Sequence, residues 1–293
     1  MKLKKVACLG LAAMLAIGAL GCGSDNKAAD NKAGSKVTGS VTGSGSSALL
    51  PLAKDAASKF KALNPDVSIT LNGGGSGTGL KQVADGSVNI GNSDVPAESK
   101  LKPEVAKGLV DHKVCVVTMA PVINKYLAAK VKSLTKAQLT DIFTAKVTNW
   151  KQVGGPDEPI VLITRPATSG TRALFQEFAL GGAKEATNKS LETDDSGTLL
   201  QSVKDNKGAI GYVALSYLVN NKDVATVAID GVEPTLDNTY NGKYPVWGYE
   251  HMYTKGEASG AVKAFLDFIL SADYGKEIEK QGYGVTAKMQ VKR

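Results

Sequence analysis

Residues 39–72 read GSVTGSGSSALLPLAKDAASKFKALNPDVSITLN, and this stretch contains two strand patterns separated by a helix pattern. Residues 40–44 and 67–71 are short and rich in β-branched and small residues, which predicts two strands. The stretch between them carries apolar residues at helical spacing. These are Leu49, Leu52, Ala53, Ala56 and Phe60. A strand, helix and strand in this order are typical of an α/β protein.

The same alternation continues along the chain. Further strands are predicted at residues 88–91, 114–120, 160–164 and 209–213. Further helices are predicted at residues 78–84, 171–180, 199–203 and 261–270, and after the capping box formed by Thr135 and Gln138. About 255 residues follow residue 38, which is enough for two lobes. We therefore expect an α/β fold with two lobes.

The first 38 residues have the pattern of an export signal followed by a linker. Three lysines precede an apolar run at residues 6–20, and Cys22 follows small residues where a lipoprotein signal is cut. We expect residues 1–21 to be removed and Cys22 to carry lipid. Residues 22–38 are polar and lack aromatics, which predicts a flexible tether. The mature protein would be exported and lipid-anchored to a membrane, on the periplasmic or outer cell-surface face.

Cysteine content excludes an internal disulfide in such a mature protein. Cys8 would be lost with the signal, and Cys22 would be lipidated. Cys115 lies in the apolar run of residues 114–117, which predicts a buried strand residue and not a catalytic one.

The charge pattern argues against a nucleic-acid partner. The formal net charge is +7, and loss of three lysines with residues 1–21 would leave about +4. The lysines are scattered and few aromatics lie among them. A weak attraction for small anions is still expected from this charge.

The tripeptide Ser-Gly-Thr occurs three times, each time at the start of a predicted helix. The copies begin at Ser76, Ser169 and Ser196. The first N–H groups of a helix have no intrahelical partner, and hydroxyls add uncharged donors, so such a start can hold an oxyanion. For Ser196 the interpretation differs, because Asp194 and Asp195 precede it and would repel an anion. We therefore interpret Ser196 as a helix N-cap.

Four polar segments follow predicted strands, where open α/β sheets place their ligands. They are residues 43–48, 73–79, 93–94 and 165–171. Any single glycine or serine among them would be explained by a turn or an N-cap. Together they supply hydroxyls, free N–H groups, one arginine and one carboxylate, which is the set of groups that binds a tetrahedral oxyanion.

Enzyme motifs are incomplete in this chain. Residues 74–81 partly match the pattern of a phosphate-binding P-loop. However, Leu80 occupies the position after the last glycine, where a P-loop has its essential lysine. A serine hydrolase elbow would need glycine two residues after Ser76, where Thr78 stands. His112 is expected in a solvated loop and His251 in a packed position, so neither is a good base. No metal-ligand spacing and no cofactor motif are found.

The order and spacing of these motifs resemble the phosphate-binding proteins of bacterial phosphate-specific ABC importers. The resemblance runs from about Gly39 to Tyr283. The matching stretches are GSGSSALLPL, GGGSGTGLKQV, IGNSD, RxxxSGTRxxF and GAIGYV, with IFTAKVTNW and KAFLDFILS outside the site. The resemblance implies a type II periplasmic-binding-protein fold in which two lobes, joined by crossover strands, close on one phosphate. Residues 39–119 and 245–293 would form lobe 1, and residues 120–244 would form lobe 2.

The resemblance also implies a set of binding residues from each lobe. Lobe 1 would supply Ser47, the Ala48 N–H, Ser76 and Asp94. Lobe 2 would supply Arg165, Ser169, Gly170 and Thr171. Arg165 would neutralise the anion. Asp94 would accept a hydrogen bond from a protonated ligand, which phosphate can give at neutral pH and sulfate cannot.

Some positions depart from the family pattern. Ala167 stands where the family often has an acidic residue, so the resemblance leaves the partner of Arg165 open. Arg172 either supports the site or lies on the helix surface. We expect a monomeric binding protein, not an enzyme, whose partners are inorganic phosphate, a membrane permease and the membrane. The alternatives are a secreted phosphate-ester hydrolase, a binding protein for another tetrahedral oxyanion, and a surface adhesin or sensor.

Overall fold

The computed structural model describes residues 36–293. The predicted signal at residues 1–21, Cys8, Cys22 and nearly all of the predicted tether at residues 22–38 lie outside the described residues.

A mixed sheet runs through both lobes. Within residues 36–293 it contains nine strands, in the order β2-β1-β3-β11-β4-β8-β6-β7, and β9 also pairs with β4. Their bounds are β1 Gly39–Gly45, β2 Val67–Asn72, β3 Ile90–Ser93, β4 Leu109–Asn124, β6 Val161–Thr164, β7 Ser190–Glu192, β8 Ala209–Ala214, β9 Val224–Thr226 and β11 Trp247–Lys255. A separate pair joins β5 (Ser133–Leu134) to β10 (Ala228–Ile229).

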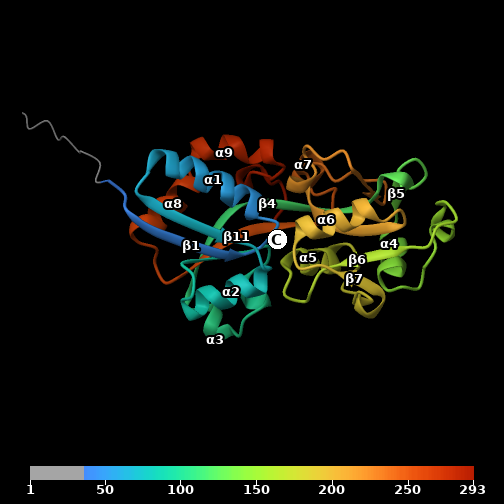
Figure 1. Cartoon of the computed structure of the whole chain (residues 1–293), viewed down its shortest axis with the longest axis horizontal. Helices are drawn as coiled ribbons and strands as arrows, with labels where there is room; N and C mark the ends of the chain where they lie inside the picture. Colours follow the sequence, from blue (N-terminus) through green and yellow to red (C-terminus); the bar gives the residue numbers. More distant parts are fainter. Residues whose placement is uncertain (1–35) are drawn as a thin grey trace, which may run out of the picture. The chain divides into compact units, whose positions relative to one another are not determined.

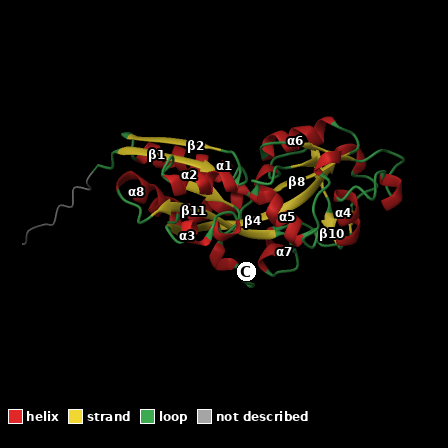
Figure 2. Cartoon of the chain, turned by 90° about the horizontal axis from the view of Figure 1, so that it is seen from below, coloured by secondary structure: helices red, strands yellow, loops and turns green. Residues whose placement is uncertain are grey.

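Strand β4 connects the two lobes. Its first part, up to Thr118, pairs with β11, and its second part, from Met119, pairs with β8. Figure 2 shows β4 passing from the strands of lobe 1 toward β8 of lobe 2. The change of partner lies within one residue of the lobe boundary expected between residues 119 and 120.

The strand directions bring the carboxyl ends of both lobes together. Strands β1, β2 and β3 are mutually parallel, and β11 is antiparallel to both β3 and β4, so these three strands run in the direction of β4. Strand β8 is antiparallel to β4, and β6 and β7 run parallel to β8. The loops after β1 and β3 therefore face the loops after β6 and β7. Ligands bind at such carboxyl ends in α/β proteins.

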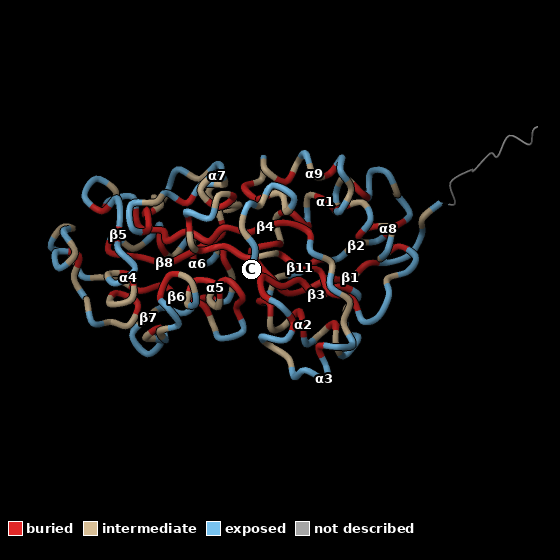
Figure 3. The backbone as a smooth tube through the Cα atoms, turned by 180° about the vertical axis from the view of Figure 1, so that it is seen from behind, coloured by how far each residue is buried: buried red, intermediate tan, exposed pale blue. Residues whose placement is uncertain are grey.

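Helices cover both faces of the sheet in lobe 1. Figure 1 shows α1 (Leu50–Leu63), α8 (Gly260–Ile269) and α9 (Ala272–Ile278) on one side, and α2 (Ser76–Asp85) and α3 (Pro103–Ala106) on the other. Leu52 and Phe60 of α1 are buried in one hydrophobic cluster with Phe265 of α8. Leu80 of α2 and Ala106 of α3 belong to a separate cluster. Strands β3 and β11 between these layers are mostly buried, as Figure 3 shows.

In lobe 2 the helices are also distributed over both faces. Leu199 and Val203 of α6 (Ser196–Asp205) pack with residues of β6 and β8. On the other side, Phe143 of α4 (Lys136–Phe143) contacts Phe175 of α5 (Gly170–Phe178) and Tyr212 of β8. Phe175 stacks on Tyr212 with their ring centroids 4.3 Å apart. The short helix α7 (Leu236–Tyr240) precedes β11.

Most predicted elements are confirmed, and the differences lie at their ends. The Thr135–Gln138 capping box forms as predicted. The strand predicted at residues 88–91 is shifted to β3, and the one predicted at residues 114–120 is part of the much longer β4. His112 lies on β4 and not in a loop, with Nε2 3.2 Å from the hydroxyl of Thr254. The pairing of β4 with β11 orders this polar start of the strand, which its local sequence does not predict.

Two further expectations concern single residues. Cys115 is fully buried on β4, as predicted, and burial raises the pKa of its thiol. His251 is buried on β11, and its Nδ1 lies 2.8 Å from a carboxylate oxygen of Asp111. None of the helices formed by residues 36–293 is long and apolar enough to span a bilayer.

Gly79 allows α2 to approach strands β1 and β3 closely. A Cβ at this position would lie 2.5 Å from the carbonyl oxygen of Ser44 and 2.6 Å from Cα of Gly45. These are backbone atoms, so the strand itself would have to move. We expect Gly79→Ala to lower the free energy of unfolding in urea by about 1–3 kcal/mol.

Gly275→Ala in α9 is the matched control, because no heavy atom lies within 4 Å of a Cβ there. This control should be neutral or slightly stabilising, since alanine favours a helix over glycine. Equal unfolding curves for the two variants would contradict the close approach at Gly79.

Candidate functional site

The predicted site residues come together where the two lobes meet. Ser47 follows β1, Asp94 follows β3 and Arg165 follows β6, so each lies at a carboxyl end of a strand that points at the other lobe. All three side chains are buried, with exposed fractions of 2%, 2% and 0%. The geometry of the sheet therefore places polar side chains from distant segments in one enclosed region.

Arg165 is a buried cation held by uncharged groups. Its Nε donates to the carbonyl of Thr193 at 3.1 Å, and its Nη2 donates to the carbonyl of Asp194 at 2.8 Å. Its Nη1 donates to the hydroxyl of Ser196 at 3.1 Å, and Nη2 also reaches the hydroxyl of Ser47 at 3.2 Å. Burial lowers the pKa of the guanidinium, but an arginine keeps its charge in proteins. A buried charge that lacks an ionic partner favours binding of an anion.

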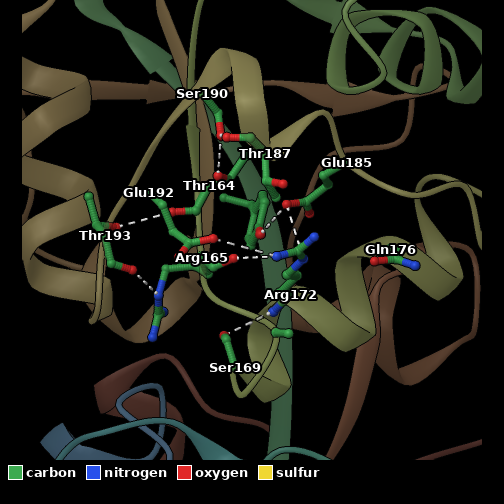
Figure 4. Close-up of polar contacts among 12 residues, drawn as sticks. Thr164, Arg165, Ser169, Arg172, Gln176, Glu185, Thr187, Ser190, Glu192 and Thr193 are labelled. Carbon is green, nitrogen blue, oxygen red and sulfur yellow. Dashed lines mark hydrogen bonds and ion pairs between the residues drawn. The ribbon is translucent and has the colours of Figure 1, made fainter.

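The Arg172 side chain contacts the backbone of Arg165 and does not lie on the solvent-exposed surface of the helix. Its Nη1 donates to the carbonyl oxygen of Arg165 at 2.8 Å, as Figure 4 shows. Its Nε lies 3.4 Å from the buried carboxyl of Glu185, which also accepts a hydrogen bond from Tyr212 at 3.1 Å. Carbonyl groups of residues 193–194 and the Arg172 side chain thus orient Arg165, although Ala167 offers no carboxylate.

Ser196 contributes to the site, and its interpretation as an N-cap is wrong. Asp195 is the N-cap of α6, because its carboxylate accepts from the N–H of Thr198 at 2.9 Å and from the Thr198 hydroxyl at 2.8 Å. The Ser196 hydroxyl instead lies 3.0 Å from the hydroxyl of Ser47 in the other lobe. The Asp195 carboxylate interacts with the first turn of its own helix. Its charge therefore does not prevent the Ser196 hydroxyl from lying beside Ser47.

Asp94 is in contact with lobe 2 through Thr171. The Thr171 hydroxyl donates to Oδ2 of Asp94 at 2.8 Å, and the Asp94 N–H donates to the hydroxyl of Ser76 at 3.0 Å. Oδ1 of Asp94 has no hydrogen-bond partner among residues 36–293. A Cβ on Gly170 would lie 2.1 Å from the Ser76 hydroxyl oxygen, so glycine permits this close approach between the lobes.

Ser169 and Ala48 lie at helix starts beside this cluster. Ser169 is the N-cap of α5, and its hydroxyl accepts from the N–H of Arg172 at 3.2 Å. Ala48 is buried two residues before α1, and its carbonyl accepts from the hydroxyl of Tyr283 at 2.5 Å. Both therefore lie where backbone N–H groups of a first helical turn are available.

Comparison with known proteins gives the site a context. The sequence model of the PBP superfamily domain matches residues 30–273. The phosphate-binding protein PstS of Bacillus subtilis is 46% identical over 299 aligned residues, which cover 100% of this chain and 98% of the relative. The chain belongs to the family of phosphate-binding proteins. Its fold is the type II periplasmic-binding-protein fold, as predicted.

Other members of this family extend the comparison. PstS of Staphylococcus epidermidis is 29% identical, with 96% of this chain and 88% of the relative covered. A crystal structure from Clostridium perfringens, assigned as a phosphate ABC transporter substrate-binding protein with bound phosphate, matches with a TM-score of 0.77 and 36% identity. The alignment includes the whole of the Clostridium chain and 85% of this chain. The crystal structure of an ABC-type phosphate transport receptor from Vibrio cholerae matches with a TM-score of 0.65 and 25% identity. The alignment covers 84% of this chain and 99% of the receptor.

The structure brings most of the predicted site residues into two groups of contacts between the lobes. One joins Ser47 to Arg165. The other joins Ser76, Asp94, Gly170 and Thr171 by hydrogen bonds or close approach. Sequence reasoning missed Ser196, Glu185 and the carbonyls of residues 193–194. The third Ser-Gly-Thr copy was a usable signal for Ser196, but the two neighbouring aspartates outweighed it. Within the described chain, no group of three or more His, Cys, Asp or Glu side chains is placed to hold a metal ion.

The buried Glu185 makes the stability of this network depend on pH. Burial raises the pKa of Glu185 from 4.5 to about 7, although the charge of Arg172 opposes the shift. The unfolded chain therefore releases this proton at lower pH than the folded protein does. We expect the free energy of unfolding to fall by about 3 kcal/mol as pH rises from about 4.5 to about 7, and Glu185→Gln to remove this fall.

Urea unfolding at a series of pH values measures this effect. Glu177→Gln is the control, because Glu177 is exposed on α5 in the same lobe. A Glu185→Gln variant whose stability falls with pH as steeply as that of the parent protein would show that Glu185 is not the group responsible.

Proposed function

We propose that this chain binds inorganic phosphate between its two lobes and delivers it to an ABC importer. The observation that carries the proposal is the buried guanidinium of Arg165, whose partners in the described chain are carbonyls and hydroxyls. The charge of Asp94 also acts on this guanidinium. A cation with an acceptor at its side suits an anion that also carries a proton. The naming of the relatives as phosphate-binding proteins agrees with this chemistry.

Each lobe contributes part of the proposed site. In lobe 1 the ligand would meet Ser47, the Ala48 N–H, Ser76 and Asp94. In lobe 2 it would meet Arg165, Ser169, the Gly170 N–H and Thr171. Hydroxyls and N–H groups donate to the phosphate oxygens, and the N-terminus of α5 adds a favourable dipole.

Asp94 would give the site its selectivity. An ionised carboxylate repels a fully ionised oxyanion but accepts a hydrogen bond from a protonated one. Phosphate carries such a proton at neutral pH, whereas sulfate does not. The same buried acceptor therefore favours phosphate and penalises sulfate.

Closure of the lobes would couple binding to transport. Hydrogen bonds already run between the lobes, from Arg165 to Ser47, from Thr171 to Asp94 and from the Gly77 N–H to the Thr168 carbonyl. We place lobe 1 at residues 39–119 and 245–293 and lobe 2 at residues 120–244, because β4 changes its partner at Met119. A ligand that contacts both lobes stabilises the closed form.

The N-terminal part of the chain would hold the protein at a membrane. Residues 1–21 would act as the export signal, Cys22 would carry the lipid, and residues 22–38 would serve as the tether. The closed protein, a monomer, would then dock on the permease of the importer at the outer side of that membrane.

Binding, and not hydrolysis, fits the hydroxyls at this site. The Ser47 hydroxyl contacts Arg165 and Ser196, and no histidine of the described chain lies within hydrogen-bonding distance of it. Both histidines are engaged on the strands of lobe 1, His251 with Asp111 and His112 with Thr254. A serine nucleophile would lack its base.

Titration calorimetry of the phosphate-stripped protein tests the proposal. We expect phosphate to bind to the parent protein and Arg165→Ala to weaken this binding at least about a hundredfold, since a buried charge partner is removed. Lys146→Ala is the control, because it removes an equal charge from a side chain of lobe 2 that is 71% exposed. Absence of phosphate binding by the parent protein would refute the proposed function.

Selectivity is tested by Asp94→Asn. The amide can donate a hydrogen bond to sulfate, so we expect the ratio of phosphate affinity to sulfate affinity to fall at least about a hundredfold. Asp66→Asn makes the same chemical change at an exposed position of lobe 1 and should leave the ratio unaltered. An unchanged ratio in Asp94→Asn would contradict the role given to this carboxylate.

A further inference from the structure

Glu250 is a buried carboxyl group next to the site that none of the binding contacts uses. It lies on β11, where it pairs with Cys115 of β4. The register shifts between Glu250 and His251, and His251 pairs with Ser93 at the end of β3. Glu250 therefore lies beside Asp94, the residue that follows Ser93.

Both carboxyl groups have oxygens that lack partners. Glu250 is 0% exposed, and neither of its carboxyl oxygens accepts a hydrogen bond from any residue between 36 and 293. Oδ1 of Asp94 is unpartnered in the same part of the chain, whereas its Oδ2 accepts from Thr171. Two ionised carboxylates buried in this position would repel each other. Such an arrangement costs several kcal/mol.

The surroundings of Glu250 favour its neutral form. Burial raises the pKa of Glu250 well above its ordinary value, and the charge of Asp94 raises it further. The other titratable groups that face it are Cys115 on β4, Tyr217 at the end of the 3-10 turn Leu215–Tyr217, and Tyr283. Burial raises the pKa of Tyr217 to about 12 and those of Cys115 and Tyr283 well above their usual ranges. None of these neighbours supplies a positive charge.

One proton shared by the two carboxyls would reside on Glu250. Asp94 already receives the Thr171 hydroxyl, and the positive charge of Arg165 acts on it. Both effects stabilise negative charge on Asp94. Glu250 has neither, so the charge belongs on Asp94 and the proton on Glu250.

We propose that Glu250 stays protonated in the folded protein and donates a hydrogen bond to Oδ1 of Asp94, which keeps Asp94 an ionised acceptor for a protonated oxyanion. Glu250 is then a positioning residue that acts through Asp94 and does not touch the ligand. The ligand in this inference rests on the proposed function, but the hydrogen bond between the carboxyls does not.

Two substitutions separate this role from simple packing. Glu250→Gln keeps the shape, the neutrality and a donor toward Asp94, so phosphate and sulfate affinities should stay within about threefold of the parent values between about pH 5 and pH 8. Glu250→Leu removes the donor and makes the ionised form of Asp94 less stable. We expect it to reduce the ratio of phosphate to sulfate affinity at least about tenfold.

Infrared spectroscopy tests the proton directly in the unmodified protein. Glutamate labelled with carbon-13 at its side-chain carboxyl should give the band of a protonated carboxylic acid at about pH 9, where exposed glutamates and also Glu185, whose pKa is about 7, are ionised. The band should persist in Glu257→Gln, whose substituted residue is exposed, and disappear in Glu250→Gln. This measurement needs no ligand and no variant that lacks the donor.

The outcomes distinguish the two proposals. Absence of the protonated band in the parent protein, or a changed pH profile of binding in Glu250→Gln, would overturn the role of Glu250. An unchanged selectivity in a folded Glu250→Leu variant would overturn it as well. A parent protein that shows the band but does not bind phosphate would refute the proposed function and leave the hydrogen bond between the carboxyls established.

Discussion

A positive charge without contact to water is the constraint on which the site depends. Arg165 is fully buried, and its nitrogens are satisfied by two carbonyls and two hydroxyls, none of which neutralises it. A second arginine, Arg172, donates to the backbone carbonyl of Arg165 and pairs with the buried carboxyl of Glu185. These two side chains therefore fix the backbone that carries the cation. Such a structure retains electrostatic potential for an anion, which a direct salt bridge would remove.

The course of β4 explains how this cation meets groups from the other end of the chain. Because β4 continues from one lobe into the other, and β8 runs against it, the parallel strands of both lobes end at the same place. Each strand end is followed by a helix start or a polar loop, so donors accumulate there without a dedicated binding element. A change in the angle between the lobes near this strand would bring the donors together or apart.

In the proposed site the two carboxyls near Arg165 would act together in recognising the ligand. Asp94 accepts a hydrogen bond from the hydroxyl of Thr171, and the fully buried Glu250 lies next to it. A carboxylate is a useful acceptor only while it is ionised, and a neighbouring neutral acid stabilises that form by donating a hydrogen bond. Recognition of a protonated anion would thus depend on the position of one proton inside the protein as well as one on the ligand.

The local sequence predicted many of the elements, although β7, β11 and α9 were not among them, and the family resemblance supplied the candidate site residues. The capping box at Thr135 forms from four consecutive residues, and the Ser-Gly-Thr copies mark helix starts wherever they occur, because capping involves neighbours in the chain. Tertiary structure decided the length of β4, which exceeds its apolar run because β11 pairs with the polar part. It also decided that the Ser196 hydroxyl faces Arg165, and that Glu250 lies beside Asp94. These relations join residues more than 30 positions apart or depend on strand register, and periodicity or composition within a segment carries no information on either.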